Sequence, residues 1–187
     1  MTLRIEDGIL STARYCPSPN CNERPASQRI DLLVIHNISL PPGEFGGDAI
    51  ERLFTNCLDC GEHPYYAALL DLEVSAHLLI KRDGELVQFV PFHLRAWHAG
   101  LSRWQGRENC NDFSIGIELE GTDDQPYTSM QYTQLIRVTE ELLRYCPQLT
   151  VDRIVGHEHI APGRKTDPGP AFDWQRYRDG LTAEEVN

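Results

Sequence analysis

Two strongly apolar segments of this chain each lead directly into a histidine. The first is Leu32-Leu33-Val34-Ile35, which is followed by His36, and the second is Ile154-Val155-Gly156, which is followed by His157. Such almost unbroken apolar runs are typical of strands buried on both faces of a sheet. Because the ends of neighbouring strands often point into a common cleft, we predict that the two imidazoles lie together.

A carboxylate follows the second histidine, within Lys165-Thr166-Asp167-Pro168-Gly169-Pro170. Two imidazoles and one carboxylate are ligands that Zn²⁺ prefers, and three protein ligands leave a fourth position for water, as in catalytic zinc sites. Taken singly, each histidine is more often a hydrogen-bonded core residue, and the aspartate is more often an ordinary turn residue. The three together predict a catalytic zinc site formed by His36, His157 and Asp167.

A further acidic residue lies inside the apolar run Phe113-Ser114-Ile115-Gly116-Ile117-Glu118-Leu119-Glu120. A buried glutamate without a partner is costly, so Glu118 is either in a structural ion pair, with Arg107 or Lys165, or a general base. Glu118 and Glu120 share one face of a regular strand, so their spacing alone does not identify the catalytic one. A metal-bound water needs a base, and Glu118 is the better-placed candidate.

Other polar and aromatic residues near these segments leave alternatives open. His159, His77 and His98 are further candidate metal ligands. Lys165 is either a solvated side chain or a group that stabilises an oxyanion opposite the metal. Trp97 lies in a loop of small residues, where an aromatic ring suits the face of a sugar or an apolar ligand, and core packing is the alternative.

Length and charge restrict the class of protein. A chain of 187 residues fits one domain with a sizeable core. The net charge of −11 lacks the basic footprint that nucleic-acid binding requires. The first residues show no apolar segment of signal-peptide length, and no stretch approaches the roughly 20 apolar residues of a membrane helix. We therefore expect a cytoplasmic protein that binds neither nucleic acid nor a membrane.

The six cysteines are expected to be mostly reduced in such a protein. Cys57-Leu58-Asp59-Cys60 is a C-x-x-C motif, which alone is a weak signal for a metal or redox site. A zinc ribbon needs a second pair, and the spacing from Cys16 to Cys21 is wider than such sites usually have. Because the motif follows a predicted helix rather than a strand, we interpret Cys57 and Cys60 as incidental loop thiols.

Local patterns predict one mixed central sheet flanked by helices, an α+β fold, although they do not determine the strand order. Residues 1–29 are polar and rich in proline, which predicts a short helix and then a surface loop. The predicted strands are 30–36, 113–119 and 152–155, with a hairpin of 75–81 and 85–90 that turns at Asp83-Gly84. The predicted helices are 48–56, 128–145 and 172–179, with Asp48 and Thr128 as N-caps of the first two.

Six segments together match a known family. The chain resembles the zinc-dependent N-acetylmuramoyl-L-alanine amidases that are related to bacteriophage lysozyme-amidases and peptidoglycan recognition proteins. The resemblance runs nearly from end to end, and its most specific parts are the long loop after His36 and the Lys-x-Asp-Pro-Gly-Pro segment. The matching segments are Val34–Gly47, Val74–His77, Arg95–Gly100, Asn111–Gly121, Gly156–His157 and Arg164–Pro170.

The resemblance implies a single α+β domain over residues 1–187, with 1–29 as an N-terminal helix and loop extension and 30–180 as the catalytic core. It implies hydrolysis of the amide between the lactyl group of (1,6-anhydro-)N-acetylmuramic acid and L-alanine, in peptidoglycan recycling, by a monomer that acts on a small soluble anhydro-muropeptide. It excludes His159, His77 and His98 as ligands. The implied site residues are the zinc ligands His36, His157 and Asp167, the general base Glu118, the transition-state stabiliser Lys165, and Asn37 and Trp97 near the substrate.

Two positions depart from the family pattern, because Glu73 and Asn109 stand where arginines are expected. Those arginines would suit the carboxylates of the stem peptide, notably of diaminopimelate, so the departure affects peptide binding and leaves the zinc chemistry untouched. A muropeptide-binding protein without catalysis and an amidase acting on polymeric wall outside the cytoplasm are the alternatives. The filled ligand positions argue against the first, and the lack of a signal segment argues against the second.

Overall fold

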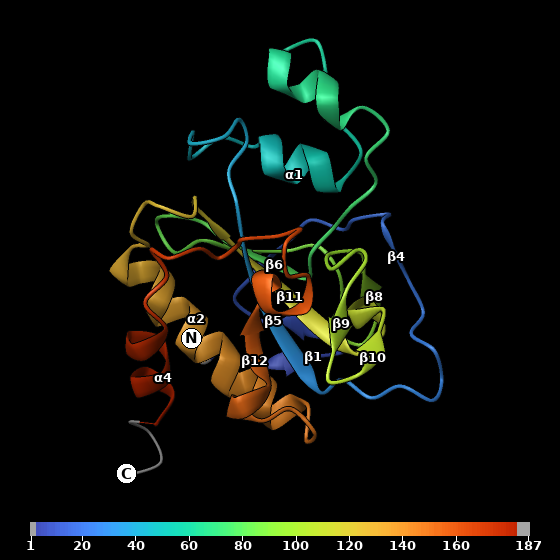
Figure 1. Ribbon diagram of the computed structural model, residues 1–187, viewed down its shortest axis with the longest axis vertical. Helices are drawn as coiled ribbons and strands as arrows, with labels where there is room; N and C mark the ends of the chain where they lie inside the picture. Colours follow the sequence, from blue (N-terminus) through green and yellow to red (C-terminus); the bar gives the residue numbers. More distant parts are fainter. Residues whose placement is uncertain (1–2, 183–187) are drawn as a thin grey trace.

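A six-stranded mixed sheet forms the centre of the computed structural model, which describes residues 3–182 (Figure 1). The first four strands in spatial order run parallel, β7 is antiparallel to β6, and the short edge strand β3 runs parallel to β7. In that order the strands are β12 (Ile154–Gly156), β5 (Leu32–Ile38), β11 (Ser114–Glu120), β6 (Leu78–Ile80), β7 (Leu86–Gln88) and β3 (Arg14–Tyr15). The predicted class, a single domain with a mixed central sheet flanked by helices, is confirmed.

Helices cover both faces of this sheet. The helices α2 (Ser129–Tyr145) and α4 (Trp174–Thr182) pack together on one face (Figure 1). The shorter helices α1 (Ala49–Phe54) and α3 (His157–Ile160) pack against residues of the opposite face. Three short 3₁₀ helices complete the helical segments: η1 (Pro64–Leu69), η2 (Cys110–Asp112) and η3 (Val151–Arg153).

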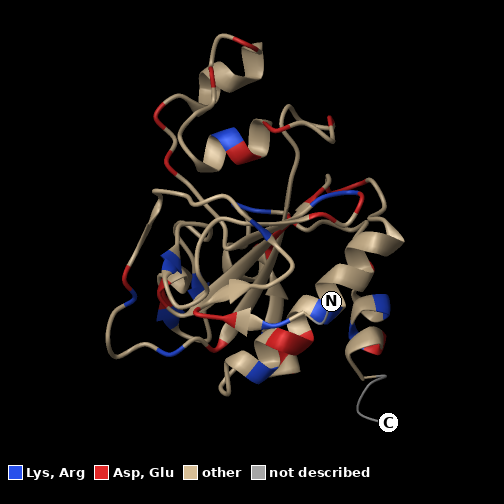
Figure 2. Cartoon of the chain, turned by 180° about the vertical axis from the view of Figure 1, so that it is seen from behind, with Lys and Arg blue, Asp and Glu red and all other residues tan. Residues whose placement is uncertain are grey.

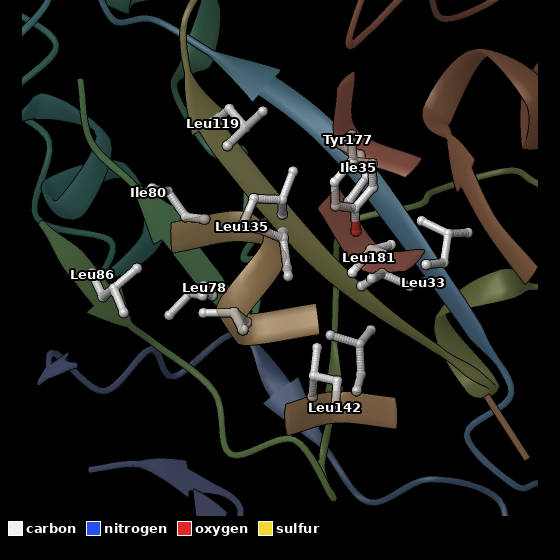
Figure 3. Close-up of a cluster of buried hydrophobic side chains, with 14 of the residues drawn as sticks. Leu33, Ile35, Leu78, Ile80, Leu86, Leu119, Leu135, Leu142, Tyr177 and Leu181 are labelled. Carbon is white, nitrogen blue, oxygen red and sulfur yellow. The ribbon is translucent and has the colours of Figure 1, made fainter. Parts of the chain in front are cut away.

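Alternation along the two central strands separates a hydrophobic core from the opposite face of the sheet. Leu33 and Ile35 of β5 point toward α2 and α4, together with Leu119 of β11 (Figure 3). Leu32 and Val34 belong to a separate apolar cluster with Ile160 of α3. Because successive side chains of a strand point to opposite faces, His36 lies on the same face as Val34, away from α2.

The helix and hairpin predictions are confirmed near their expected bounds. The side chain of Thr128 accepts the backbone N–H of Gln131, and Gln131 Oε1 accepts the N–H of Thr128, so a capping box begins α2. The hairpin of β6 and β7 turns at Gly84, whose φ of 89° favours glycine. Asp48 precedes α1, but it pairs with Arg52 instead of capping the helix.

Ion pairs tie α1 to the edge of the sheet. Glu51 accepts hydrogen bonds from Arg14, which belongs to β3, and from Lys81, which follows β6. In Figure 2, acidic and basic residues lie next to each other on this helix. Side chains of α1 such as Leu53 and Phe54 pack in the same apolar cluster as Leu79 and Phe89. The helix therefore has a fixed place beside the cavity described below.

The helix predicted within residues 1–29 is wrong for the described part of that segment. Asp7 and Gly8 adopt φ of 49° and 79°, which is the left-handed geometry of a tight hairpin turn, so the chain forms strands there. The edge strand β3, which lies in the same segment, pairs with β7 of the central sheet. The small strand pairs are β1 (Ile5–Glu6) with β2 (Ile9–Leu10), β4 (Cys21–Asn22) with β8 (Arg95–Ala96), and β9 (Arg103–Trp104) with β10 (Arg107–Glu108).

The strand predicted over 152–155 is shifted along the chain. Residues 151–153 form η3, and β12 covers Ile154–Gly156.

Among residues 3–182, no helix has the length and apolar character needed to cross a lipid bilayer.

Packing of α2 on the sheet predicts a stability difference between two positions on that helix. Leu135 is fully buried against the sheet (Figure 3), whereas Met130 is 51% exposed. We expect Leu135→Ala to lower the free energy of unfolding by about 2–5 kcal/mol, because it leaves a cavity in the core. The matched variant Met130→Ala is expected to stay within about 0.5 kcal/mol of the parent in urea unfolding. Equal effects of the two variants would contradict this packing.

Candidate metal centre and active site

Three side chains converge on the sheet face that lies away from α2 and α4. The Nδ1 atoms of His36 and His157 are 2.9 Å apart, and Asp167 Oδ2 lies 3.1 Å and 3.0 Å from them. The imidazoles are almost fully buried, and the Asp167 side chain is 13% exposed. Within the part of the chain that the structure describes, this is the one cluster of His, Cys, Asp and Glu side chains with the geometry to hold a metal ion.

Each of these residues comes from a different kind of element. His36 lies within β5, which continues to Ile38, and is therefore not its last residue. His157 is the first residue of α3, directly after the parallel neighbour β12. Asp167 lies in the loop after α3, and its backbone carbonyl accepts the N–H of Glu158, which ties the loop to the start of the helix. The pairing of β5 with β12 thus brings the two histidines together.

The donor set suits a cation. His157 Nε2 lies 3.2 Å from the carbonyl oxygen of Ala99, which can only accept, so this nitrogen carries the proton and Nδ1 presents a lone pair. Burial lowers the pKa of His36 to about 4, so its imidazole is neutral at pH 7. Two ring nitrogens and a carboxylate oxygen therefore face one another with too few N–H donors to pair all three atoms by hydrogen bonds. A metal ion would satisfy all three of these atoms.

Glu118 lies directly beside this cluster, because the parallel register of β11 with β5 pairs Glu118 with His36. Its side chain is buried, and Oε2 has no hydrogen-bond partner. Burial raises its pKa well above the ordinary value, the charge of Asp167 raises it further, and Lys165 opposes the shift. A carboxyl group with a raised pKa binds a proton more readily than an exposed glutamate does.

The two glutamates of β11 differ in their hydrogen bonds. Glu120 Oε1 accepts the backbone N–H of Gly46 at 2.6 Å, and its Oε2 accepts that of Arg82 at 3.0 Å. Its carboxylate therefore holds two loops together. The ion pair considered between Glu118 and Arg107 does not form, because Arg107 pairs with Asp31 at 2.7 Å.

A cavity of about 610 Å³ opens beside these groups. His36, His157, Asp167, Glu118 and Lys165 all line it. Apolar and aromatic side chains contribute much of the remaining wall, which is typical of a site for a small ligand. They include Leu40, Leu53, Phe54, Tyr65, Leu69, Leu72 and Trp97.

Asn37 and Trp97 both line this cavity, and both also have structural contacts. Asn37 Nδ2 donates to Asp123 Oδ1 at 2.8 Å and to the carbonyl of Pro168 at 3.1 Å, next to Asp167. Trp97 Nε1 donates to Asn22 Oδ1 at 2.8 Å, which leaves the indole half-buried on the wall. The amide of Asn37 therefore anchors the loop that carries Asp167.

The three other candidate histidines lie outside the metal cluster. His159 Nδ1 accepts the N–H of Gly156, and its side chain is 49% exposed. His77 is buried, and its Nδ1 accepts the N–H of Gly116. His98 Nδ1 contacts His36 Nε2, which is the nitrogen of His36 that points away from the metal cluster.

Comparisons with known proteins show the family. A model of the family described as N-acetylmuramoyl-L-alanine amidase matches residues 26–170. The chain belongs to this amidase family. It is 59% identical over 174 residues to 1,6-anhydro-N-acetylmuramyl-L-alanine amidase AmpD of Escherichia coli K12, covering 93% of this chain and 94% of that protein. It is 58% identical over 178 residues to AmpD of Enterobacter cloacae, covering 95% of each.

Solved structures of other amidases share the fold. A crystal structure of a selenomethionine AmpD derivative matches with a TM-score of 0.93 at 57% identity, over 95% of this chain and 99% of that one. A complex of the amidase AmiD from Escherichia coli with the substrate anhydro-N-acetylmuramic acid-L-Ala-D-γ-Glu-L-Lys matches with a TM-score of 0.61 at 28% identity, over 96% of this chain and 65% of that one. The endolysin LysCS of Clostridium intestinale, at 14% identity and a TM-score of 0.65, shows the same fold.

The two departures from the amidase family pattern lie in different places. Glu73 lines the cavity, at the side formed by residues 69–74. Asn109 is exposed and precedes η2 with a φ of 57°, a left-handed conformation that asparagine tolerates better than most residues. It is not among the residues that line the described cavity. Of the two, Glu73 is therefore the one placed to meet a ligand.

Sequence reasoning missed several residues that support this amidase site. Tyr127 donates its hydroxyl to the carbonyl of Pro168 at 2.7 Å, and so helps Asn37 to hold the loop of Asp167. Asn111 accepts backbone N–H groups beside His98. These contacts span more than 10 residues in sequence, so no local pattern indicates them.

All six cysteines are free thiols, as expected. Cys57 and Cys60 lie in the loop after α1, and neither contributes to the metal cluster. They form neither a ribbon-type metal site nor a disulfide in this structure.

The contrasting surroundings of Glu118 and Glu120 predict opposite effects of the same isosteric change. In Glu120→Gln, an amide NH₂ faces a backbone N–H donor, so we expect the free energy of unfolding to fall by about 1–3 kcal/mol. Glu118→Gln replaces a desolvated carboxyl group that has an unpartnered oxygen, so we expect unchanged or increased stability. Urea unfolding of both variants at pH 7 measures this difference. A larger loss for Glu118→Gln would contradict the assignment of Glu120 as the structural carboxylate.

Proposed function

We propose that this chain is a zinc-dependent amidase that hydrolyses the amide bond between the lactyl group of 1,6-anhydro-N-acetylmuramic acid and L-alanine in soluble muropeptides. The observation that carries the proposal is the cluster of His36, His157 and Asp167, which shares one cavity with the buried and unpartnered carboxyl group of Glu118. The proposal includes a role in peptidoglycan recycling, with the cytoplasm as the site of action.

Zinc is the proposed metal because two imidazoles and one carboxylate are ligands that it prefers, and three protein ligands leave a position open. His36, His157 and Asp167 would hold it. When bound, such an ion supplies Lewis acidity, which polarises a carbonyl group and makes a water molecule a stronger acid.

Glu118 is proposed to move the proton. Its carboxylate accepts a proton from the attacking water as the water oxygen bonds to the amide carbon. The same proton then passes to the nitrogen of L-alanine as the carbon–nitrogen bond breaks, so the leaving group departs as a neutral amine. The raised pKa of Glu118 suits both steps, because the group must be deprotonated first and protonated afterwards.

Lys165 is proposed to stabilise the negative charge that develops on the carbonyl oxygen. It lines the cavity, and its positive charge acts on Glu118 and His36. An ammonium group close to a developing oxyanion lowers the energy of the transition state. Asn37 and Trp97 are proposed to lie near the bound substrate, with Trp97 packing on the sugar or the peptide.

The proposed substrate follows the relatives. AmpD is named as a 1,6-anhydro-N-acetylmuramyl-L-alanine amidase, and two related amidases have been solved with anhydromuramic peptides. A cavity of about 610 Å³ has the size of a site for a small ligand rather than for a polymer. Muropeptide binding without catalysis is a weaker candidate, because all three proposed ligand positions and the position of the base are filled.

We expect the reaction to depend on a bound metal. Purified protein is incubated with anhydro-N-acetylmuramyl-tripeptide, and mass spectrometry follows release of the tripeptide and the anhydro-sugar. A chelator should abolish release, and one equivalent of Zn²⁺ should restore it. The reason is that the amide would be polarised by the metal ion and not by the three proposed ligands themselves. The control substrate is intact sacculi, which we expect to be turned over more slowly. Release that persists undiminished after chelation and dialysis would contradict the proposal.

Removal of the proposed base should separate metal binding from turnover. We expect Glu118→Gln to retain bound zinc and to lower kcat by about 10²–10⁴-fold, because it removes proton transfer and leaves the proposed ligands in place. Glu44→Gln, at an exposed carboxylate in the loop after β5, is the control and should keep both the bound zinc and the kcat of the parent. A kcat of Glu118→Gln close to that of the parent would falsify the role of Glu118.

A further inference from the structure

His98 contacts the proposed ligand His36, and the next residue, Ala99, contacts the proposed ligand His157. We infer that His98 and Asn111 are positioning residues for the metal, which hold His36 and His157 in the tautomers that turn both Nδ1 lone pairs toward it. This inference rests on the proposed function, since it concerns the metal that the three ligands would hold. It assigns a role to two segments, Arg95–Gly100 and Asn111–Gly121, whose buried polar residues the proposed chemistry leaves unexplained.

A chain of hydrogen bonds fixes the tautomer of His36. The hydroxyl of Ser114 donates to the carbonyl oxygen of Cys110 at 2.6 Å, so Ser114 Oγ is left to accept from His98 Nε2 at 3.1 Å. With its proton on Nε2, neutral His98 presents a lone pair at Nδ1, which accepts from His36 Nε2 at 2.9 Å. His36 Nδ1 is therefore unprotonated and available to a metal.

Ala99, the residue after His98, fixes the tautomer of His157. The carbonyl oxygen of Ala99 accepts from His157 Nε2 at 3.2 Å and from Arg164 Nη2 at 2.6 Å. The lone pair of His157 Nδ1 then points toward His36 and Asp167. One dipeptide, His98-Ala99, thus supplies the acceptor for both imidazoles, one through its side chain and one through its backbone.

Asn111 fixes this dipeptide in place. Its Oδ1 accepts the backbone N–H of His98 at 3.1 Å and that of Ala99 at 2.8 Å. The Asn111 side chain is buried, so no water competes easily for these two bonds. A single amide oxygen therefore sets the position of both acceptors, although Asn111 itself contacts neither histidine ligand.

The packing of the His98 ring confirms how closely it is held against β11. A Cβ atom on Gly116 would lie 2.4 Å from His98 Cγ, which is far closer than real carbon atoms approach. Glycine at this position therefore allows the ring to lie close against the strand that carries Ser114 and Glu118. Groups that orient metal-bound histidines typically change metal affinity by 10–100-fold when they are removed.

The test measures Zn²⁺ affinity of the metal-free protein by competition with a chromophoric chelator. We expect His98→Phe, which keeps an aromatic ring but removes the acceptor, to bind Zn²⁺ about 10–100-fold more weakly than the parent. Ser114→Ala should act in the same direction, because it removes the acceptor that fixes the His98 tautomer. The control is His77→Phe, at a buried histidine that lies outside the metal cluster and forms hydrogen bonds to none of the proposed ligands, and it should leave the affinity unchanged.

Asn111 gives a second test that does not depend on the His98 variants folding. Asn111→Ala should lower the Zn²⁺ affinity, and Asn111→Asp, which keeps an oxygen acceptor at the same position, should restore most of it. The visible absorption of bound Co²⁺ reports the coordination geometry independently of activity, and we expect it to change in Asn111→Ala and not in Asn111→Asp.

The outcomes separate this inference from the proposed function. Failure of the parent protein to bind Zn²⁺ would overturn the proposed metal site itself. A parent that binds Zn²⁺, with equal affinity and an unchanged Co²⁺ spectrum in Asn111→Ala, would overturn the positioning role alone. Melting temperatures of the metal-free variants identify a general loss of stability. Equal losses of affinity in His77→Phe and His98→Phe would also contradict the inference.

Discussion

The parallel register of β5 with β11 decides which side chains meet at the candidate site, because it pairs His36 with Glu118. The preceding residues of the two strands, Ile35 and Ile117, point the other way and pack in the core under α2. A slip of one residue would exchange the two faces and bury His36 among leucines. Apolar packing against α2 on one face therefore fixes the polar geometry on the other.

Burying so many polar groups on one face requires that they satisfy one another. His36, His98 and Asn111 each have hydrogen-bond partners within the protein, as expected for buried polar groups. Glu118 differs, since its Oε2 has none. The proposed metal ligands are therefore surrounded by paired polar groups, whereas the carboxyl group proposed to transfer the proton keeps an unpartnered oxygen and a raised pKa.

Residues with strong local patterns were predicted well, and residues that depend on distant partners were not. The strand β11 and Thr128 as the N-cap of α2 both follow from neighbours in sequence. The two glutamates of β11 share a face, so only the contacts of Glu120 with Gly46 and Arg82 distinguish them. The prediction of an N-terminal helix was wrong because the left-handed geometry at Asp7 turns the chain into a hairpin. The strand order likewise depends on pairings across the whole chain.

We propose that His36 and His157 present their Nδ1 atoms to one metal ion together with Asp167. Imidazole ¹⁵N chemical shifts, recorded before and after one equivalent of Zn²⁺, test it most directly. We expect zinc to shift the Nδ1 signals of these two histidines and to leave their Nε2 atoms protonated. Unchanged signals, or a shift of the ring nitrogens of His77 or His159 in their place, would contradict it.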